Sequence, residues 1–365
     1  MPTIGPDGPF LDSLFSVLFY VVGSFGILAN ALLISVITFR TPTALRGYRI
    51  LLLNQASIDL LFSVLLTLSQ FRYFTREGLT PRIPRLTMTG WFTFVYYDLG
   101  PLRHTPPGLQ LLAHCLALNN LLPSFFSTPL SFAYRYLVLV ERERPTCIAS
   151  RNLKIFALLT HGAALMATIP YAWGAESHEY LQEQVQLTHP SYNISDHVLY
   201  GTNLLRSPHL FFSFVVPTLP VFPAFLLTLF FKSKTMVYLN SHRDSMSPGT
   251  LSIHRRVAKA LSVQSTLPFF FLLAPVSVFL VVWFCQLSVP LVEYSLFLCT
   301  AVIALLNPIA TFYFITPYKK TLWRWFYVAT GRRRSSVTPI WLSMSNSVVV
   351  LPSPSHRKSR SNNIL

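Results

Sequence analysis

The sequence predicts a bundle of seven membrane-spanning helices, and its composition is the first reason. Of 365 residues, 52% are hydrophobic and only 12% are charged, whereas about 25% of residues in an ordinary soluble domain are charged. A bilayer core needs roughly 20 apolar residues in helical form. Seven runs of sufficient length and almost no charge occur, at residues 14–39, 50–71, 109–134, 155–173, 210–231, 260–284 and 291–315.

These runs divide the chain into four parts. Residues 1–13 form a short N-terminal segment, 14–315 the bundle, 316–330 an interfacial helix and 331–365 a basic tail that we expect to be disordered. The first run is not expected to be a signal peptide, because no basic residue precedes it and no small-residue cleavage site follows it. We expect it to remain as the first helix.

Charge predicts the orientation of the bundle. The net charge of +16 comes mainly from the first, third and fifth connections between the runs and from the tail, whereas the other side is slightly acidic. Cytoplasmic segments carry the excess of Lys and Arg, so the N-terminus is expected outside and the tail in the cytosol. The exception is a cluster after the second run, consisting of Arg72, Arg76, Arg82 and Arg85. Three of these arginines lie within residues 75–108, which we expect to form an irregular aromatic lid.

Three further segments carry signals for modification or membrane contact. Asn193 begins an Asn-Ile-Ser sequon in a loop assigned to the outside, which predicts glycosylation unless the sequon is a chance match. Residues 316–330 interleave basic and aromatic side chains, as an interfacial helix does. Ser335 and Ser336 follow three arginines, a pattern favoured by basic-directed kinases. The alternative for that arginine cluster is a plain stop-transfer signal.

Polar residues inside the apolar runs are costly and usually functional. Asp59 is the one acid deep inside a run, and we expect it to face the bundle with Asn30 and Asn307 as partners. It could be a protonated acid, or its charge could be balanced by a small cation such as sodium. Asn120 and Ser124 precede Arg135 by nearly whole helical turns, so these three share one helix face. Arg135 could instead extend to the lipid headgroups.

The order of these residues resembles that of rhodopsin-like G-protein-coupled receptors. Asn30, Asp59, Arg135 and Asn307-Pro308 follow one another as the polar positions of that superfamily do. Residues 50–61, 131–139 and 307–319 resemble nematode serpentine chemoreceptors, and most of all the Srd class. The resemblance covers residues 14–330 and implies a multi-pass plasma-membrane protein, in a sensory cilium, with no cofactor.

The resemblance also implies two partners besides the lipid bilayer. One is a small neutral or hydrophobic ligand within the bundle, since the acid that amine receptors carry in helix 3 is replaced by Ala117. The other is a heterotrimeric G protein, and we expect the contacts from the triplet around Arg135 and from the basic connection of residues 232–259: Tyr134, Arg135, Tyr136, Arg255 and Arg256. Tyr134 precedes Arg135 at a position where rhodopsin-like receptors usually have an acid. Thr311 likewise replaces the usual tyrosine of helix 7, and residues 174–209 contain no cysteine for a disulfide.

Other function classes fit less well. Nucleic-acid binding is not expected, because the basic residues flank apolar runs. Metal and redox chemistry are not indicated, because the four cysteines are too few and too widely spaced for a disulfide scaffold or a zinc site. No HExxH or GxSxG motif suggests an enzyme. A transporter or channel is the alternative, although such proteins usually show internal repeats or several embedded charges.

Overall fold

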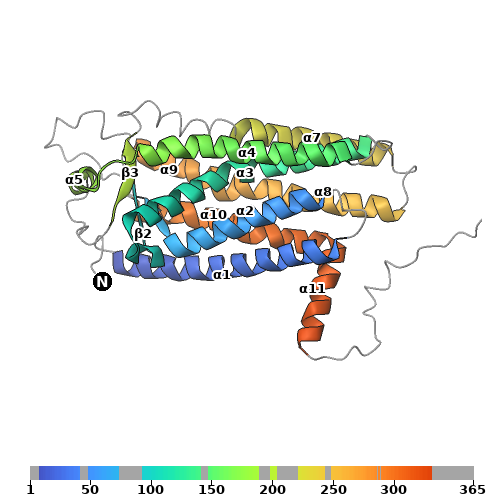
Figure 1. Cartoon of the computed structure of the whole chain (residues 1–365), viewed down its shortest axis with the longest axis horizontal. Coiled ribbons are helices and arrows are strands. Elements are labelled where there is room, and N and C mark those ends of the chain that lie inside the picture. Colours follow the sequence, from blue (N-terminus) through green and yellow to red (C-terminus); the bar gives the residue numbers. More distant parts are fainter. Residues whose placement is uncertain are drawn as a thin grey trace, which may run out of the picture. The chain divides into compact units, whose positions relative to one another are not determined.

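The computed structural model describes residues 8–41, 48–73, 93–140, 147–188, 198–203, 221–242, 248–285, 287 and 289–330. Long helices run side by side through most of the described chain (Figure 1). Two compact units are present, Met1–Thr321 and Leu322–Leu365. The first unit contains the helix bundle and a small sheet.

The long helices coincide with the apolar runs. They are α1 (Gly8–Arg40), α2 (Arg49–Ser69), α3 (Pro107–Val140), α4 (Cys147–Trp173), α7 (Val221–Ser241), α8 (Pro248–Pro268), η4 (Phe269–Leu273), α9 (Ala274–Phe284) and α10 (Pro290–Phe314). Within the described ranges, six helical stretches are long and apolar enough to cross a membrane. The run predicted at 210–231 begins among residues outside the description, and α7 contains its second half.

A proline explains the one irregular stretch within these helices. Pro268 ends α8, and the next turn, η4, is π-helical, with the amide of Ala274 donating to the carbonyl of Phe269. Proline removes a helical hydrogen bond, and π-bulges produce local bends. The predicted sixth span is therefore a continuous path of α8, η4 and α9. In α3, by contrast, Pro123 and Pro129 lie within an unbroken helix.

A three-stranded antiparallel sheet covers one end of the bundle, here called the sheet end. It consists of β1 (Phe71–Tyr73), β2 (Thr93–Asp98) and β3 (Tyr200–Asn203), in that order. No strand was predicted from the sequence, because Thr93–Asp98 lacks a clean alternation of apolar and polar residues. Helix α5 (His178–Thr188) packs Leu181 and Val185 against Val95 and Tyr97 of β2, and the 3₁₀ turn η3 (Pro101–His104) follows the sheet.

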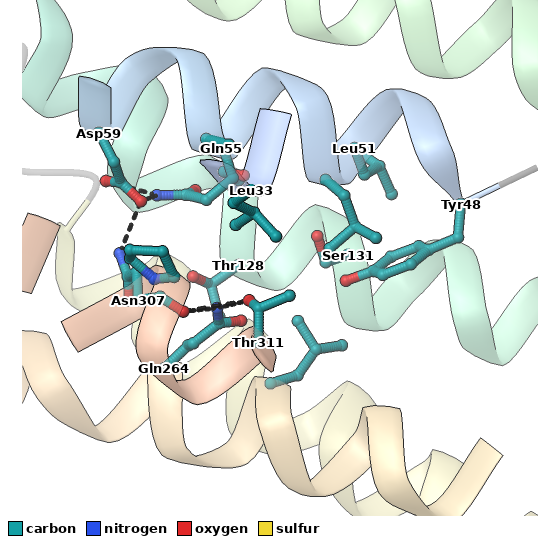
Figure 2. A pocket seen from close by; sticks show the side chains of 15 residues that line it. Leu33, Tyr48, Leu51, Gln55, Asp59, Thr128, Ser131, Gln264, Asn307 and Thr311 are labelled. Atoms are coloured by element: carbon teal, nitrogen blue, oxygen red, sulfur yellow. Dashed lines mark hydrogen bonds between the residues drawn. The ribbon is translucent and has the colours of Figure 1, made fainter. Parts of the chain in front are cut away.

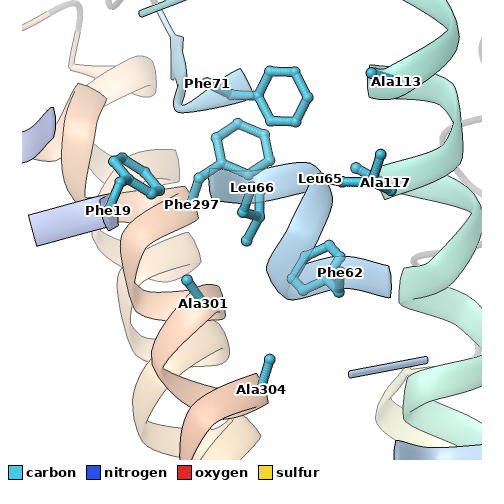
Figure 3. Packing of buried hydrophobic residues seen from close by; sticks show 10 residues of the cluster. All are labelled: Phe19, Phe62, Leu65, Leu66, Phe71, Ala113, Ala117, Phe297, Ala301 and Ala304. Carbon is cyan, nitrogen blue, oxygen red and sulfur yellow. The ribbon is translucent and has the colours of Figure 1, made fainter. Parts of the chain in front are cut away.

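A hydrophobic cluster joins the sheet to the helices. Its members come from α1, α2, β1, α3 and α10 (Figure 3): Phe19, Phe62, Leu65, Leu66, Phe71, Ala113, Ala117, Phe297, Ala301 and Ala304. Small residues bring the helices close together. A Cβ on Gly23 of α1 would lie 1.8 Å from Oγ1 of Thr67 on α2, so only glycine permits this approach. The cluster fixes the helices that position the polar residues.

Helix α11 (Thr316–Ala329) extends into the second unit, within the range predicted for an interfacial helix. Trp323, Phe326 and Val328 are exposed aromatic and apolar side chains on this helix. Basic residues alternate with them along the sequence, as in helices that lie in a membrane interface. Membrane contact by α11 therefore remains our prediction.

Candidate functional site

A buried polar centre lies around Asp59 of α2. Its side chain is 3% exposed. The amide nitrogen of Gln55, one helical turn earlier, donates to both carboxylate oxygens at 3.0 Å, and the amide of Asn307 on α10 donates to Oδ2 at 3.0 Å (Figure 2). The amide of Asn307 therefore connects the carboxylate to α10, whereas the amide of Gln55 holds it within α2.

Further hydrogen bonds extend this centre to α8 and α1. The amide of Gln264 donates to the carbonyl of Asn307 and to the hydroxyl of Thr311, both at 2.9 Å. The hydroxyl of Thr311 donates in turn to the Asn307 carbonyl. Asn30 of α1 donates to the carbonyl of Ala304 on α10 at 2.9 Å. Asn30 and Asn307 thus both stabilise α10, but only Asn307 contacts the carboxylate.

Helix α3 meets this centre through residues other than the two predicted. The amide of Asn120 donates to the carbonyl of Leu116 in its own helix at 2.8 Å. The α3 side chains that line the cavity beside Asp59 are Ser127, Thr128 and Ser131, one to two turns beyond Ser124 and two to three turns beyond Asn120. Spacing places them on the same helix face as Ser124, but the depth at which α3 crosses α2 was not accessible from spacing along one helix.

The cavity beside Asp59 has a volume of about 20 Å³, enough for one water molecule or one small cation. The amide oxygens of Gln55 and Asn307 are buried and, among the described residues, have no hydrogen-bond partner. Together with the carboxylate and the α3 hydroxyls they form a set of oxygen ligands, which hard cations prefer. The residues present therefore fit a sodium ion.

Arg135 lies at the opposite end of the bundle, here called the Arg135 end. Its side chain is 5% exposed. One guanidinium nitrogen donates to the backbone carbonyl of His254 on α8 at 3.1 Å, and the guanidinium carbon lies 4.9 Å from the centre of the Tyr48 ring. No ion pair of Arg135 occurs within the described chain. A backbone carbonyl and the aromatic side chain of Tyr48 therefore hold this arginine.

The other residues predicted for coupling surround Arg135. Tyr134 stacks with Tyr48 at 6.4 Å between ring centroids, and Tyr136 contacts Phe231 of α7 at 6.2 Å. Arg255 donates to Asn240 of α7 at 3.4 Å. Arg256 donates to the hydroxyl of Thr316. The Arg135 end therefore brings together residues of α3, α7 and α8, the N-cap residue of α2 and the first residue of α11.

An ion-pair network at the sheet end was not predicted. Arg72 of β1 is 1% exposed and donates to Glu293 of α10 at 2.9 Å, to Asp12 of α1 at 3.4 Å and to the hydroxyl of Tyr97 at 2.7 Å. Its guanidinium lies 4.2 Å from the ring of Tyr294, whose hydroxyl donates to Asp12. A charge that looked like an exposed loop arginine is buried between two helices and the sheet.

Asp98, the last residue of β2, was also missed. It is 2% exposed, and neither carboxylate oxygen has a hydrogen-bond partner among the described residues. Burial raises the pKa of Asp98 to about 8. Buried polar groups are nearly always hydrogen-bonded, so an unpaired carboxylate indicates a functional position or stored instability.

The sequence model of one protein family matches residues 15–324, and its description is serpentine type 7TM GPCR chemoreceptor Srd. The chain belongs to the Srd family. Among its relatives in Caenorhabditis elegans, serpentine receptor class delta-1 is 30% identical over 83% of this chain and 78% of that protein. Serpentine receptor class delta-3 is 28% identical over 94% of this chain and 96% of that protein. The resemblance found in the sequence is confirmed.

A solved structure supports the architecture of this Srd chain. Squid rhodopsin superposes with a TM-score of 0.56 at 12% identity, covering 96% of this chain and 91% of the rhodopsin. At this identity the likeness concerns the fold alone. With six described spans and the second half of the predicted fifth run in α7, the seven-transmembrane fold is confirmed. The Srd protein is therefore a multi-pass membrane protein of a receptor family. Asn193, Ser335 and Ser336 lie outside the described residues.

Proposed function

We propose that this Srd receptor activates a heterotrimeric G protein through the Arg135 end, in response to a small molecule bound nearer the sheet end. The observation that carries the proposal is the state of Arg135. It is buried, always charged, and held by one backbone carbonyl and one ring rather than by an acid. Such contacts are weaker than a buried ion pair and can be exchanged for contacts with a partner.

The neighbouring helix offers a way to release this arginine. His254 lies on α8, and the π-helical turn η4 follows Pro268 on the same helix. Bending at η4 would move the Arg135 end of α8 without disturbing the sheet end. Arg135 would then lose the His254 carbonyl and face an opened cleft, into which a segment of the G protein could insert.

The charge around the cleft suits an acidic partner surface. Exposed or partly exposed basic side chains follow α7 and α8, namely Lys232, Lys234, Arg255, Arg256 and Lys259. Complementary charge accelerates encounter between proteins and orients the complex. Together with Tyr134, Arg135 and Tyr136, these residues form the proposed coupling surface.

Replacing Arg135 with alanine should abolish receptor-driven nucleotide exchange on the G protein while surface expression is retained. The reason is that alanine removes the one buried cation that could enter the partner interface. The measurement is GTP-analogue uptake by a G protein mixed with receptor in nanodiscs. Arg103→Ala, a partly exposed arginine of η3 at the sheet end, is the control and should exchange normally. Undiminished exchange by Arg135→Ala would refute the coupling role.

We further propose that the N-terminus lies outside the plasma membrane and the tail inside, with a sensory cilium as the site. The arginine cluster after the second run is the main exception to the excess of basic residues on the cytoplasmic side. Its unpaired positive charge is reduced because Arg72 is paired with Asp12 and Glu293. If Asn193 is outside, the protein should migrate faster after deglycosylation, and Asn193→Gln should remove that shift. A C-terminal tag should be reached by antibody only after permeabilisation. Labelling of intact cells would reverse the orientation.

A ligand between the helices and the sheet is supported by the unsatisfied polar groups found there. The expectation of a neutral ligand depended on the missing acid at Ala117 of α3. An acid is nevertheless present at this end of the bundle, because β2 brings Asp98 to the sheet end. The chemistry around Asp98 therefore bears directly on the ligand class.

A further inference from the structure

One face of the small sheet points toward the helices. Alternate residues of a strand share a face, and residues paired across strands share it too. Phe71 pairs with Asp98, and Tyr96 pairs with Tyr200, so these four side chains lie on one face. His114 of α3 contacts this face, with its ring stacked on Tyr96 at 3.7 Å between centroids. The four residues and His114 are here called the inner-face cluster.

The inner-face cluster contains three buried polar groups without partners among the described residues. They are both carboxylate oxygens of Asp98, the hydroxyl of Tyr200 and Nδ1 of His114. Tyr200 is 5% exposed and His114 is fully buried. Burial raises the pKa of the Tyr200 phenol, and the nearby charge of Asp98 raises it further. Because Tyr200 pairs with Tyr96, two residues before Asp98 on the same strand face, Asp98 and Tyr200 are diagonal neighbours that could contact one bound group.

Aromatic rings form the remainder of the cluster. Phe71 meets Tyr96 and His114 edge-on at 6.4 and 4.8 Å, and Tyr200 lies 5.4 Å from Tyr96. The hydroxyl of Tyr171 on α4 donates to that of Tyr96 at 3.1 Å. An acidic group beside several ring faces attracts an organic cation, because the rings are negative on their faces and the carboxylate only accepts hydrogen bonds.

Other ligand classes fit these groups poorly. A phosphate or carboxylate would be repelled by the ionised form of Asp98, which a cation would instead stabilise. The described residues include no group of three His, Cys, Asp or Glu side chains that could hold a metal ion. The neighbouring cation Arg72 is already engaged by Glu293 and Asp12 on the other face of the sheet. A ligand that donates hydrogen bonds and carries positive charge remains.

We propose that the inner-face cluster binds a small arylalkyl amine in its protonated form. The ammonium would donate to Asp98 and to the oxygen of Tyr200, while its apolar part packs against Phe71 and Tyr96. Since the carboxylate is buried, rings of the cluster must move aside for a ligand to enter. This inference rests on the proposed function, because it names the ligand class of that receptor.

The first test needs no ligand. Asp98→Asn keeps the shape and removes a buried charge, so the variant should melt about 2–4 °C higher than wild type at pH 8. The pKa of Asp98 is raised, so the folded protein holds a proton that the unfolded chain releases, and wild type loses stability as pH rises from 5 toward 8. The difference between the two proteins should therefore be smaller at pH 5.

Other titratable groups do not confound this comparison. Those near Asp98 include Arg72 of β1, Tyr96 and Tyr97 of β2, Tyr200 of β3, Arg103 and His104 of η3, and His114 and Cys115 of α3. Both proteins contain them, so their titration largely cancels in the difference. A variant that melts at or below the wild-type temperature at pH 8 would show that Asp98 has a stabilising partner, and would overturn the inference.

The second test uses amines paired with alcohols of the same skeleton, beginning with phenethylamine and 2-phenylethanol and continuing through primary and secondary arylalkyl amines. Amines should raise the melting temperature of wild type, with no rise from the alcohols and none in Asp98→Asn. The control is Glu179→Gln, which removes an exposed acid of α5 at the same end and should preserve the amine response.

Two results would overturn the assignment. One is a complete amine panel without effect on wild type, and the other is an equal response in Asp98→Asn. Neither readout requires a G protein. If amines bind but no nucleotide exchange follows, the proposed function fails and the binding site stands. If the protein drives nucleotide exchange but binds no amine, the proposed function stands and the amine assignment fails.

Discussion

Replacing Arg72 with methionine is expected to lower the free energy of unfolding by about 3–5 kcal/mol. Methionine has a similar length but leaves Glu293, which is fully buried, and Asp12 without their shared cation. Two carboxylates would then face each other across α1 and α10. Thermal unfolding of the purified protein should show a melting temperature lower by roughly 6–20 °C.

A second variant separates lost charge from lost packing. Glu293→Gln in the Arg72→Met background removes one of the stranded charges, so the double variant should recover part of the lost stability. Arg103→Met, a partly exposed arginine at the same end, should change stability little. If Arg72→Met is as stable as Arg103→Met, the network contributes nothing to the fold and another contact holds the sheet end together.

Replacing Asp59 with asparagine is expected to remove the sodium dependence of basal signalling. In wild type, a sodium ion in the cavity beside Asp59 would stabilise the arrangement in which Gln55 and Asn307 contact the carboxylate. Basal nucleotide exchange should therefore fall by about fivefold or more as sodium rises, which corresponds to a typical coupling between two sites. Asparagine keeps the volume but lacks the charge that a cation requires.

A control variant and a contradicting result are both defined for the sodium experiment. Glu179→Gln also removes one acid, but from an exposed position on α5, and it should retain the wild-type sodium response. Potassium at equal ionic strength should replace sodium poorly. Because screening does not distinguish the two ions, this difference would indicate specific binding of sodium. If wild type and Asp59→Asn respond to sodium alike, Asp59 is a packed structural group and not a switch.

The helices and their polar residues were accessible from the sequence because each depends on local properties. Apolar length locates a span, and a lone carboxylate in such a span must find partners inside the bundle. Asn307 was predicted as a partner of Asp59 and donates to it. Gln55 was overlooked, although its position four residues before Asp59 places both on one face of α2. Spacing could have identified it.

The sheet end depends on contacts that no local pattern encodes. Arg72 meets Glu293 across 221 residues of chain, so its burial follows from how β1 enters between α1 and α10. Asp98 was predicted to lie in an irregular lid. Its burial beside Phe71, without a hydrogen-bond partner among the described residues, follows from the pairing of β1 with β2. Likewise, the cavity hydroxyls of α3 differ from those predicted because the crossing depth of two helices is a property of their packing.

We expect α8 to move away from Arg135 when the G protein binds. The most direct measurement is the distance between spin labels at Val140 of α3 and Lys259 of α8, both exposed near the Arg135 end, in a receptor whose native cysteines have been replaced. Nucleotide-free G protein should shift the distance distribution to longer values, and Arg135→Ala should prevent the shift. Identical distributions with and without G protein would contradict the claim.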